Sequence, residues 1–551
     1  MKTGEDRSPS VIRANTVSYG CFCLSTSRVL AAQHSRIDGE ELDHMLARKV
    51  DSRQKAQAHV KRAGGEAHVP VLMRQAPLIE EVQTPLCEWF RVLGRSGAIS
   101  ANCAPILQAA RRSFRQIIDP QPTSDLSMRL CVDPNAASGP PWPPPHFRGL
   151  SHLVYAGLDS ECSLLLDLRR RRAIGRFSPA MAQDAEHWQR VIFPNAIGLM
   201  SEALGLTTLH CACVERDGSG LLLSGGSGAG KSTLALALAR NGFAFLSDDW
   251  TYFSGAGAQL RAWGLASPVK LLPDATRHFP ELGSLKPALS SNGELAYELD
   301  PEPVFGVDHA LTCEPRWLVF LERRDSAGYT MTRMAPHEAA ARLEVDLEDL
   351  PVEFSAVRES QSGTILELGG RECWLLCYGE PPSEIAQVLA RFCSNSPHAV
   401  PREAWRAESS SKSARTGPDI IRRFTPTPLV ADLRAMNCAI RLETNSPAVL
   451  QQVCDAVGGR RSSETAPQRF LWRLVSDVGA DSHLPWSAPS GFSANGLLLE
   501  NIGQHNFFAV DAEARIAVGF VAEGLVNDPE FEKRFAARLV SATLAAFETA
   551  I

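Results

Sequence analysis

Residues 221–253 read LLLSGGSGAGKSTLALALARNGFAFLSDDWTYF, and this stretch decides the fold. Its first apolar run predicts a strand, and Lys231 opens a leucine- and alanine-rich segment that predicts a helix. Between them, residues 225–232 satisfy G-x-x-x-x-G-K-[ST], the phosphate-binding loop. Backbone N–H groups of such a loop turn toward phosphate oxygens, and the helix N-terminus and the lysine add positive potential. The stretch therefore predicts a nucleotide site in an α/β domain.

The predicted ligands of this loop are ATP and Mg²⁺, and the Ser232 hydroxyl is the expected magnesium ligand from the loop. A second apolar run, residues 243–246, is followed by the adjacent carboxylates Asp248 and Asp249. Two such carboxylates can divide the work, because one holds Mg²⁺ while the other accepts a proton from an incoming hydroxyl. The predicted nucleotide-binding residues are Gly225, Gly226, Ser227, Gly228, Ala229, Gly230, Lys231, Ser232 and Thr233.

The bulk properties exclude several classes of partner. A net charge of −6 gives no electrostatic case for nucleic acid. No apolar stretch approaches the roughly 20 residues that span a bilayer, so we expect no membrane partner. The 14 cysteines are scattered, with no C-x-x-C pair and no histidine cluster, which predicts reduced thiols in a cytoplasmic protein. A homo-oligomer stays open.

The chain of 551 residues is too long for one core and divides by composition. Residues 1–80 are polar and predict a poorly structured extension. Met73 is an alternative start, so whether residues 1–72 belong to the native protein stays open. Residues 85–207 predict an α+β module, 208–394 the nucleotide domain, 395–424 a linker and 425–551 a second module. We expect helices at 105–114, 180–204, 337–343 and 384–392, and strands at 128–132, 209–214, 317–322, 364–368 and 373–377.

The second module predicts a repeat of the first. The run NCAPILQ at 102–108 aligns with NSPAVLQ at 445–451, an offset of 343 residues. At an offset of 344, Gly175 aligns with Gly519 and Asp184 with Asp528. An ordered series of matches at a nearly constant offset predicts a duplicated accessory module on either side of the nucleotide domain.

Residues 210–250, which run from HCACVERDGSG through the loop to FLSDDW, resemble the catalytic domain of the HPr kinase/phosphorylase family. The resemblance rests on a histidine before the loop, the loop itself and the acid pair after it. It implies that Lys231 and Ser232 bind ATP phosphates and Mg²⁺, that Asp248 is the catalytic base and that Asp249 is a metal-site acid. It places His210 beside Asp248, to orient that base or tune its pKa.

The resemblance implies an α/β fold with a nucleotide-binding kinase domain of the HPr kinase type, here flanked by two similar α+β accessory modules. It implies ATP- and Mg²⁺-dependent, serine kinase-like phosphotransfer to a hydroxyl of a protein or peptide. A later signature run of the family, similar to RGLGIIDV, is missing after Trp317, where the chain reads WLVFLERRDSAG. HPr itself is therefore not the expected acceptor, and the sequence does not identify another.

Two other functions stay open. A nucleotide-binding regulatory or scaffold protein would bind ATP, lose it on Lys231→Ala and transfer no phosphate. A small-molecule kinase, or a relative of ATP-dependent phosphoenolpyruvate carboxykinase, would need basic residues gathered for its substrate; the candidates are Lys270, Lys286, Arg323 and Arg324. Convergence of His210, Asp248 and Asp249 beside an open cleft favours the kinase, whereas a module or loop that fills the cleft favours the binding protein.

Overall fold

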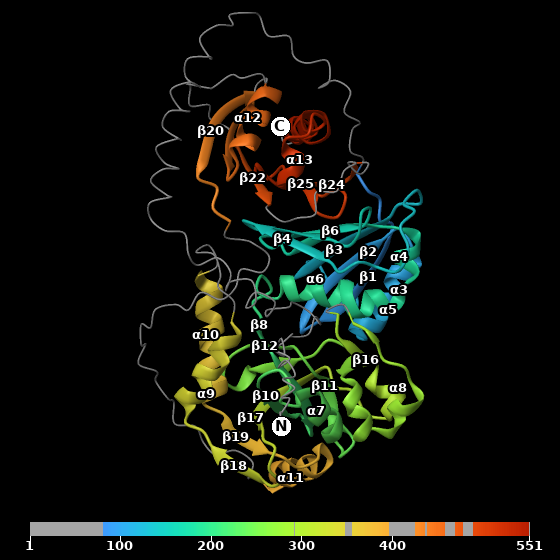
Figure 1. The fold of residues 1–551 in the computed structure, drawn as a ribbon, viewed down its shortest axis with the longest axis vertical. Coiled ribbons are helices and arrows are strands. Elements are labelled where there is room, and N and C mark those ends of the chain that lie inside the picture. The colour runs from blue at the N-terminus through green and yellow to red at the C-terminus, as the bar shows by residue number, and fades with distance from the viewer. Residues whose placement is uncertain are drawn as a thin grey trace, which may run out of the picture.

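The computed structural model describes residues 81–290, 293–347, 355–395, 425–435, 438–457, 469–477 and 489–549. The predicted extension at 1–80 and nearly all of the predicted linker at 395–424 lie outside the described residues. The described chain is mixed α/β and contains several sheets. Three units lie in a row, with the N-terminal unit between the central and the C-terminal unit (Figure 1).

The central unit carries the phosphate loop on a nine-stranded sheet. The strand order is β11-β9-β10-β17-β13-β12-β8, with β19 paired to β17 and β18 paired to β19. A smaller sheet has the order β14-β16-β15. The elements are β8 (Thr207–Leu209), β9 (Cys211–Arg216), β10 (Ser219–Ser224), α7 (Lys231–Ala239), β11 (Ala244–Ser247), β12 (Thr251–Ser254), η3 (Gly257–Gln259), β13 (Arg261–Trp263), β14 (Val269–Leu271), η4 (Pro273–Arg277), η5 (Pro280–Ser284), β15 (Ala288–Leu289), β16 (Leu295–Leu299), α8 (Pro301–Phe305), β17 (Thr312–Arg323), β18 (Tyr329–Arg333), α9 (Pro336–Leu343), η6 (Glu344–Asp346), α10 (Ser355–Gly369), β19 (Glu372–Tyr378) and α11 (Pro382–Asn395).

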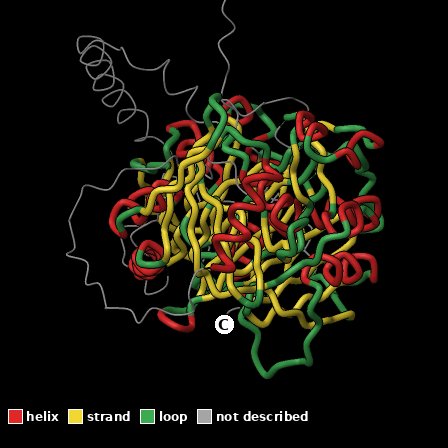
Figure 2. Tube along the Cα trace, turned by 90° about the horizontal axis from the view of Figure 1, so that it is seen from below, coloured by secondary structure: helices red, strands yellow, loops and turns green. Residues whose placement is uncertain are grey.

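Helices cover both faces of this sheet. Strands β10, β17 and β19 are parallel neighbours. Helices α7 and α11 pack on one face, and α9 and α10 contribute to a separate core on the other. Burial on both faces explains why β10 and β17 read as continuous apolar runs and not as alternating ones. The view from below shows the strands between flanking helices (Figure 2).

Three of the expected elements differ in the structure. The strand expected at 209–214 is interrupted at His210, so that its residues divide between β8 and β9, which are not neighbours in the sheet. The strand expected at 364–368 is wrong, since these residues lie inside α10. Ile365 and Leu368 are three residues apart and both fully buried against α9, so helical spacing outweighs their local strand propensity. The helix expected at 180–204 is broken into short pieces. Its elements are α4 (Pro179–Gln183), α5 (Ala185–His187), the π-helix η2 (Trp188–Ile192) and α6 (Phe193–Met200).

The two outer units have the same strand order. The N-terminal sheet runs β1-β2-β3-β7-β6-β5-β4, and the C-terminal sheet runs β20-β21-β22-β26-β25-β24-β23. The N-terminal elements before α4 are β1 (Leu86–Val92), β2 (Arg95–Ala101), α3 (Ala104–Phe114), β3 (Leu126–Val132), β4 (His146–Leu150), β5 (Leu153–Gly157), β6 (Ser163–Asp167) and β7 (Arg172–Phe177). The C-terminal elements are β20 (Leu429–Ala435), β21 (Cys438–Thr444), α12 (Pro447–Ala456), β22 (Arg469–Asp477), β23 (Ser490–Ala494), β24 (Leu497–Ile502), β25 (Asn506–Asp511), β26 (Ile516–Ala522), α13 (Glu523–Val526), the π-helix η8 (Glu532–Ala536) and α14 (Ala537–Thr549).

The ladders of the two sheets are also in the same register. Leu130 pairs with Gly175 between β3 and β7, and Leu474 pairs with Gly519 between β22 and β26. Both residues of the second pair follow their counterparts by 344 positions. The π-helices η2 and η8 are separated by the same offset. Duplication of one module stays a prediction, and the shared strand order is the structural fact.

The two outer sheets pack face to face. A single hydrophobic core contains side chains from β5, β6 and β7 together with side chains from β23 to β26. At its centre the rings of Tyr155 and Phe507 stack with their centroids 3.8 Å apart. All five residues of β5 and of β6 are buried, since the helices of the N-terminal unit and the C-terminal sheet cover opposite faces.

A cluster of buried charges crosses this interface. The Asp511 carboxylate is fully buried and lies 2.9 Å from Nε2 of His152 and 2.7 Å from a guanidinium nitrogen of Arg170. Asp167, also buried, contacts Arg170 and Arg172. Burial by itself would raise the pKa of Asp511, but hydrogen bonds from His152 and the chain, with the nearby Arg170 charge, lower it to about 2.

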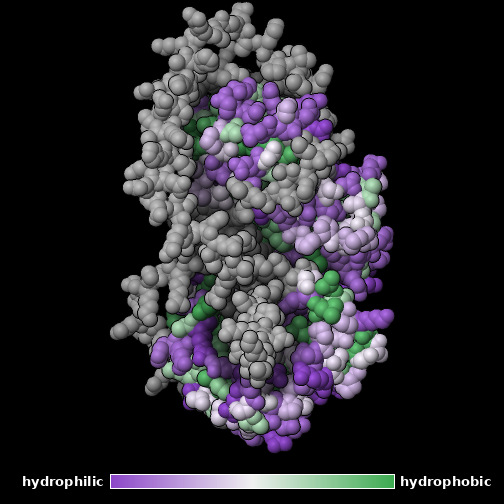
Figure 3. All heavy atoms as spheres, in the orientation of Figure 1, coloured by the Kyte–Doolittle hydropathy of each residue, from purple (hydrophilic) through white to green (hydrophobic). Residues whose placement is uncertain are grey.

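The surface in Figure 3 is mostly hydrophilic over the described part of the face in view, with smaller hydrophobic patches. None of the helices in the described residues combines the length and the apolar character that a membrane crossing requires. Every cysteine within the described ranges is free.

We predict that Asp511→Asn lowers the free energy of unfolding by about 2 kcal/mol at pH 7, since His152 and Arg170 lose their shared carboxylate. A lowered pKa in the folded state means that this contribution is present above about pH 4 and is lost as the pH falls toward 2. The difference between variant and wild type in urea unfolding should therefore shrink on acidification. Asp455→Asn, at an exposed position, should change stability by no more than about 0.5 kcal/mol; an equal loss in both variants contradicts the assignment.

Candidate active site

The phosphate loop connects the end of β10 to the start of α7, and three of its glycines have positive φ angles that other residues rarely adopt. Gly225, Gly228 and Gly230 have φ of 154°, 80° and 91°. A Cβ on Gly230 would lie 2.5 Å from the Tyr378 hydroxyl oxygen. By contrast, a Cβ on Gly226 or Gly228 would meet no atom within 4 Å, so this side of the loop faces open space.

The start of α7 is suited to an anion. Its N-cap, Gly230, supplies no side-chain hydrogen bond, so no side chain occupies the first backbone N–H groups of the helix in the cap position. The Lys231 ammonium group donates to the carbonyl oxygens of Gly225 at 2.8 Å and Gly226 at 3.5 Å. The lysine thus lies folded against its own loop, and it is buried.

Tyr378, at the end of β19, holds the loop from the neighbouring part of the sheet. Its hydroxyl donates to the Ala229 carbonyl oxygen at 2.7 Å. The side chain is fully buried, and burial raises the pKa of its phenol. No local pattern in the sequence predicts this contact, because the two residues are 149 positions apart.

Asp248 and Asp249 follow β11 directly and have different surroundings. Asp248 is buried, and its Oδ2 accepts a hydrogen bond from the Lys270 backbone N–H at 2.9 Å. Burial, together with the adjacent Asp249 charge, raises the pKa of Asp248 to about 7. Asp249 is half-buried. The two carboxyl groups therefore differ: Asp248 is buried and has a raised pKa, whereas Asp249 lies closer to solvent.

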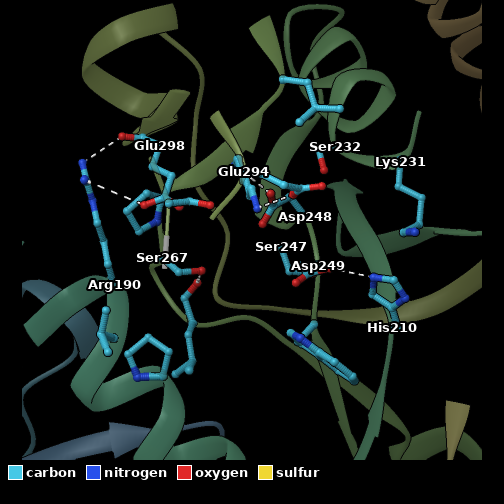
Figure 4. A pocket seen from close by; sticks show the side chains of 18 of the residues that line it. Arg190, His210, Lys231, Ser232, Ser247, Asp248, Asp249, Ser267, Glu294 and Glu298 are labelled. Carbon is cyan, nitrogen blue, oxygen red and sulfur yellow. Dashed lines mark hydrogen bonds and ion pairs between the residues drawn. The ribbon is translucent and has the colours of Figure 1, made fainter. Parts of the chain in front are cut away.

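His210 contacts Asp249 and not Asp248. It lies in the short turn between β8 and β9, and its Nε2 is 2.7 Å from Oδ1 of Asp249. The expectation that this histidine lies beside Asp248 needs this correction. The ring is also packed against Trp250, with centroids 5.4 Å apart. A dashed line in Figure 4 marks the contact between His210 and Asp249.

One cavity of about 420 Å³ joins these groups. Its lining includes His210, the acid pair, Ser227, Gly228 and residues 230–233. The other predicted loop residues, Gly225, Gly226 and Ala229, do not belong to its described lining. The N-terminal unit forms part of the wall, through Trp142 and the broken helix between residues 184 and 194. Arg190 and Glu298 lie at one side of the view in Figure 4, and Lys231 and His210 lie at the other.

Sequence reasoning missed this wall. Asp184 interrupts the helix expected at 180–204 and caps α5 through a hydrogen bond from the His187 backbone N–H at 3.0 Å. Its other oxygen accepts from the Trp142 ring nitrogen at 2.8 Å. The π-helix then presents Arg190, which donates to the Glu298 carbonyl oxygen at 2.8 Å. In the sequence Asp184 is only a repeat position, and nothing local links Asp184 or Trp142 to the loop.

The four basic residues considered for a carboxylated substrate do not gather in the cavity. Lys270 and Arg323 line it, whereas Lys286 and Arg324 do not belong to its described lining. The Lys270 ammonium group is paired with Glu294 at 2.8 Å.

The structure contains one three-residue group with metal-ligand geometry in the part of the chain that it describes: His152, Asp167 and Asp511. This group lies between the two outer sheets, away from the cavity. Arg170 and Arg172 already neutralise its carboxylates, so the cluster is an ion-pair network.

No protein-family model matches the chain, and no curated protein matches it. Among solved structures, it is similar to the HPr(Ser) kinase/phosphatase from Coxiella burnetii with 14% identity and a TM-score of 0.21. The similarity covers 34% of this chain and 97% of that protein. At this TM-score it carries no argument, and the site rests on its own geometry.

We predict that Tyr378→Phe weakens nucleotide binding about threefold to tenfold, because the loop loses one hydrogen bond worth about 1 kcal/mol. Titration calorimetry with ATP measures the change. Tyr329→Phe is the matched control, since Tyr329 pairs with Tyr378 across the ladder and is exposed. Unchanged affinity in Tyr378→Phe would show that the loop needs no support from β19.

Proposed function

We propose that this chain is an ATP- and Mg²⁺-dependent kinase that transfers the γ-phosphoryl group to a hydroxyl of a protein or peptide. The observation that carries this proposal is the cavity in which the phosphate loop, His210, Asp248 and Asp249 meet. The groups come from three separate turns of the central unit, and the N-terminal unit forms a wall beside them without filling the space. Such convergence next to an open cavity supports phosphotransfer over simple nucleotide binding.

The loop fits a nucleotide triphosphate. Gly226 and Gly228 leave room where phosphate oxygens would lie, and the start of α7 has no competing side-chain cap. Lys231 already lies against the loop and has an ammonium group suited to the terminal phosphates. We infer that this lysine exchanges its loop carbonyls for phosphate oxygens when ATP binds.

The oxygen donors at the end of the loop fit Mg²⁺. Ser232 supplies a hydroxyl and Asp249 a carboxylate, and both line the cavity. Bound there, the ion would neutralise charge on the phosphates. His210, at 2.7 Å from Asp249, would hold that carboxylate in position.

Asp248 is the proposed base. The acceptor hydroxyl oxygen forms a bond to the γ-phosphorus, the bond to the β–γ bridging oxygen breaks, and ADP leaves with that electron pair. The hydroxyl proton moves to the Asp248 carboxylate. A carboxyl whose pKa is about 7 suits this role near neutral pH, and the Lys270 N–H fixes its orientation.

We predict that Asp248→Asn retains ATP affinity but lowers turnover by at least about a hundredfold, because the amide cannot accept the proton. Release of ADP and labelled phosphate transfer, each measured with Mg²⁺ present, test this. Asp308→Asn, on an exposed carboxylate outside the cavity, should match wild type.

Equal turnover in Asp248→Asn and wild type would refute the assigned base. ATP binding that Lys231→Ala removes, with no transfer to any protein or peptide, would favour a regulatory or scaffold role. The small-molecule alternative that needs a basic cluster has less support, since Lys270 is paired with Glu294.

A further inference from the structure

The cavity beside the phosphate loop is acidic. The described part of its lining has seven carboxylates and four lysine or arginine side chains. The carboxylates belong to Asp184, Glu186, Asp248, Asp249, Asp274, Glu294 and Glu298, and the cations to Arg190, Lys231, Lys270 and Arg323. A bound nucleotide triphosphate with one divalent cation adds further negative charge. An acceptor that enters this space therefore meets a negative field.

The cations near the N-terminal wall are already engaged. Arg190 is shared between two carboxylates, Glu186 at 3.4 Å and Glu298 at 3.9 Å. Lys270 is paired with Glu294 at 2.8 Å. One guanidinium group between two carboxylates leaves an excess of negative charge on this wall, and Asp184 adds to it.

Asp184 is charged at neutral pH. Burial acts to raise its pKa, but hydrogen bonds from Trp142 and the His187 N–H, with neighbouring positive charge, lower it overall. The Trp142 ring lies next to this carboxylate and lines the same wall. A carboxylate beside an aromatic ring is a favourable environment for an ammonium or guanidinium group.

Exposed leucines also line the cavity. Nine large hydrophobic side chains are exposed in the described residues, and four of them lie between positions 272 and 295. Leu272 and Leu289 line the cavity with 46% and 74% of their surface exposed. Leu295 is opposite Leu289 in the β15–β16 ladder and is 48% exposed. Exposed leucines beside an acidic cavity indicate contact with a larger partner than a metabolite.

We propose that the acceptor is a polypeptide segment in which a lysine or arginine lies near the reacting hydroxyl and an apolar side chain contacts the exposed leucines. The proposal rests on the kinase function proposed above. The basic side chain lies against Asp184, Glu186 and Trp142, so the N-terminal unit selects the acceptor while the central unit binds ATP.

Three serine peptides test this proposal. They share one leucine and are identical except for the residue beside the serine, which is lysine, glutamine or glutamate. Affinity is measured by fluorescence anisotropy with Mg²⁺ and a non-hydrolysable ATP analogue, and phosphorylation is measured separately with ATP. We expect the lysine peptide to bind about tenfold more tightly than the glutamate peptide, with a matching difference in KM.

Glu186→Lys changes the charge of the wall at an exposed side chain and should remove or reverse this preference. Glu530→Lys is the matched control. Glu530 follows Glu186 by 344 positions and contacts Arg534 at 3.3 Å, as Glu186 contacts Arg190. Glu530 does not belong to the described lining of the cavity, so this variant should keep the wild-type preference.

Leu289→Ser should weaken all three peptides about threefold, since it removes apolar contact at an exposed leucine without changing charge. Affinity for the ATP analogue, measured for every variant, reports whether the central unit is intact.

The outcomes separate the two proposals. Equal binding of the three peptides, or the same effect of Glu186→Lys and Glu530→Lys, overturns the inference even if phosphate is transferred. A preference for lysine in the binding assay without any phosphate transfer supports the binding of a basic segment in this cavity and refutes the kinase function.

Discussion

The site depends on the common direction of four strands. Strand β10 is parallel to β17, and β17 to β19. Strand β11 runs the same way as β10, because both are antiparallel to β9. The carboxyl ends of all four therefore meet at one edge of the sheet. The phosphate loop, the acid pair, Arg323 and Tyr378 all follow or end these strands, and this geometry brings chemistry from distant parts of the chain into one cavity.

The N-terminal unit completes that cavity because its last helix is broken. A continuous helix over residues 180–204 would not hold Asp184 as a cap between α4 and α5, and would not contain the π-helix that presents Arg190. π-Helices are uncommon and occur often at functional sites. The corresponding η8 in the C-terminal unit presents Arg534 at the same position. Of the two outer units, only the N-terminal one contributes to the described lining of the cavity.

The C-terminal unit does not belong to the described lining of the cavity and packs on the N-terminal unit instead. Its sheet covers the face of the N-terminal sheet opposite the helices that meet the central unit. Without that cover, the side chains around Tyr155 would be exposed to water. The buried network of Asp511, His152 and Arg170 crosses the same interface beside this apolar contact. The two units in the upper half of Figure 1 therefore lie together because their sheets share one hydrophobic core.

The sequence by itself determined the parts of the site that are local. The phosphate loop lies within eight consecutive residues, 225–232, and its positive φ angles favour glycine at fixed spacings. The motif can therefore be recognised from the sequence without knowledge of the fold. The acid pair is recognised by its place directly after an apolar run, and the predicted repeat by matching residues at an offset of about 344. Local propensity failed at 364–368, where packing of Ile365 and Leu368 against α9 made a helix.

Packing of the folded chain determines which groups meet. It paired His210 with Asp249, raised the pKa of Asp248 by burying it, and tied the loop to Tyr378. It also made the broken helix of the N-terminal unit a wall of the cavity. Burial and contacts between distant residues arise when sheets and helices pack, and they leave no periodic trace in the sequence. The loop can therefore be recognised from consecutive residues, whereas the opposite wall of the cavity depends on the packing of two separate units.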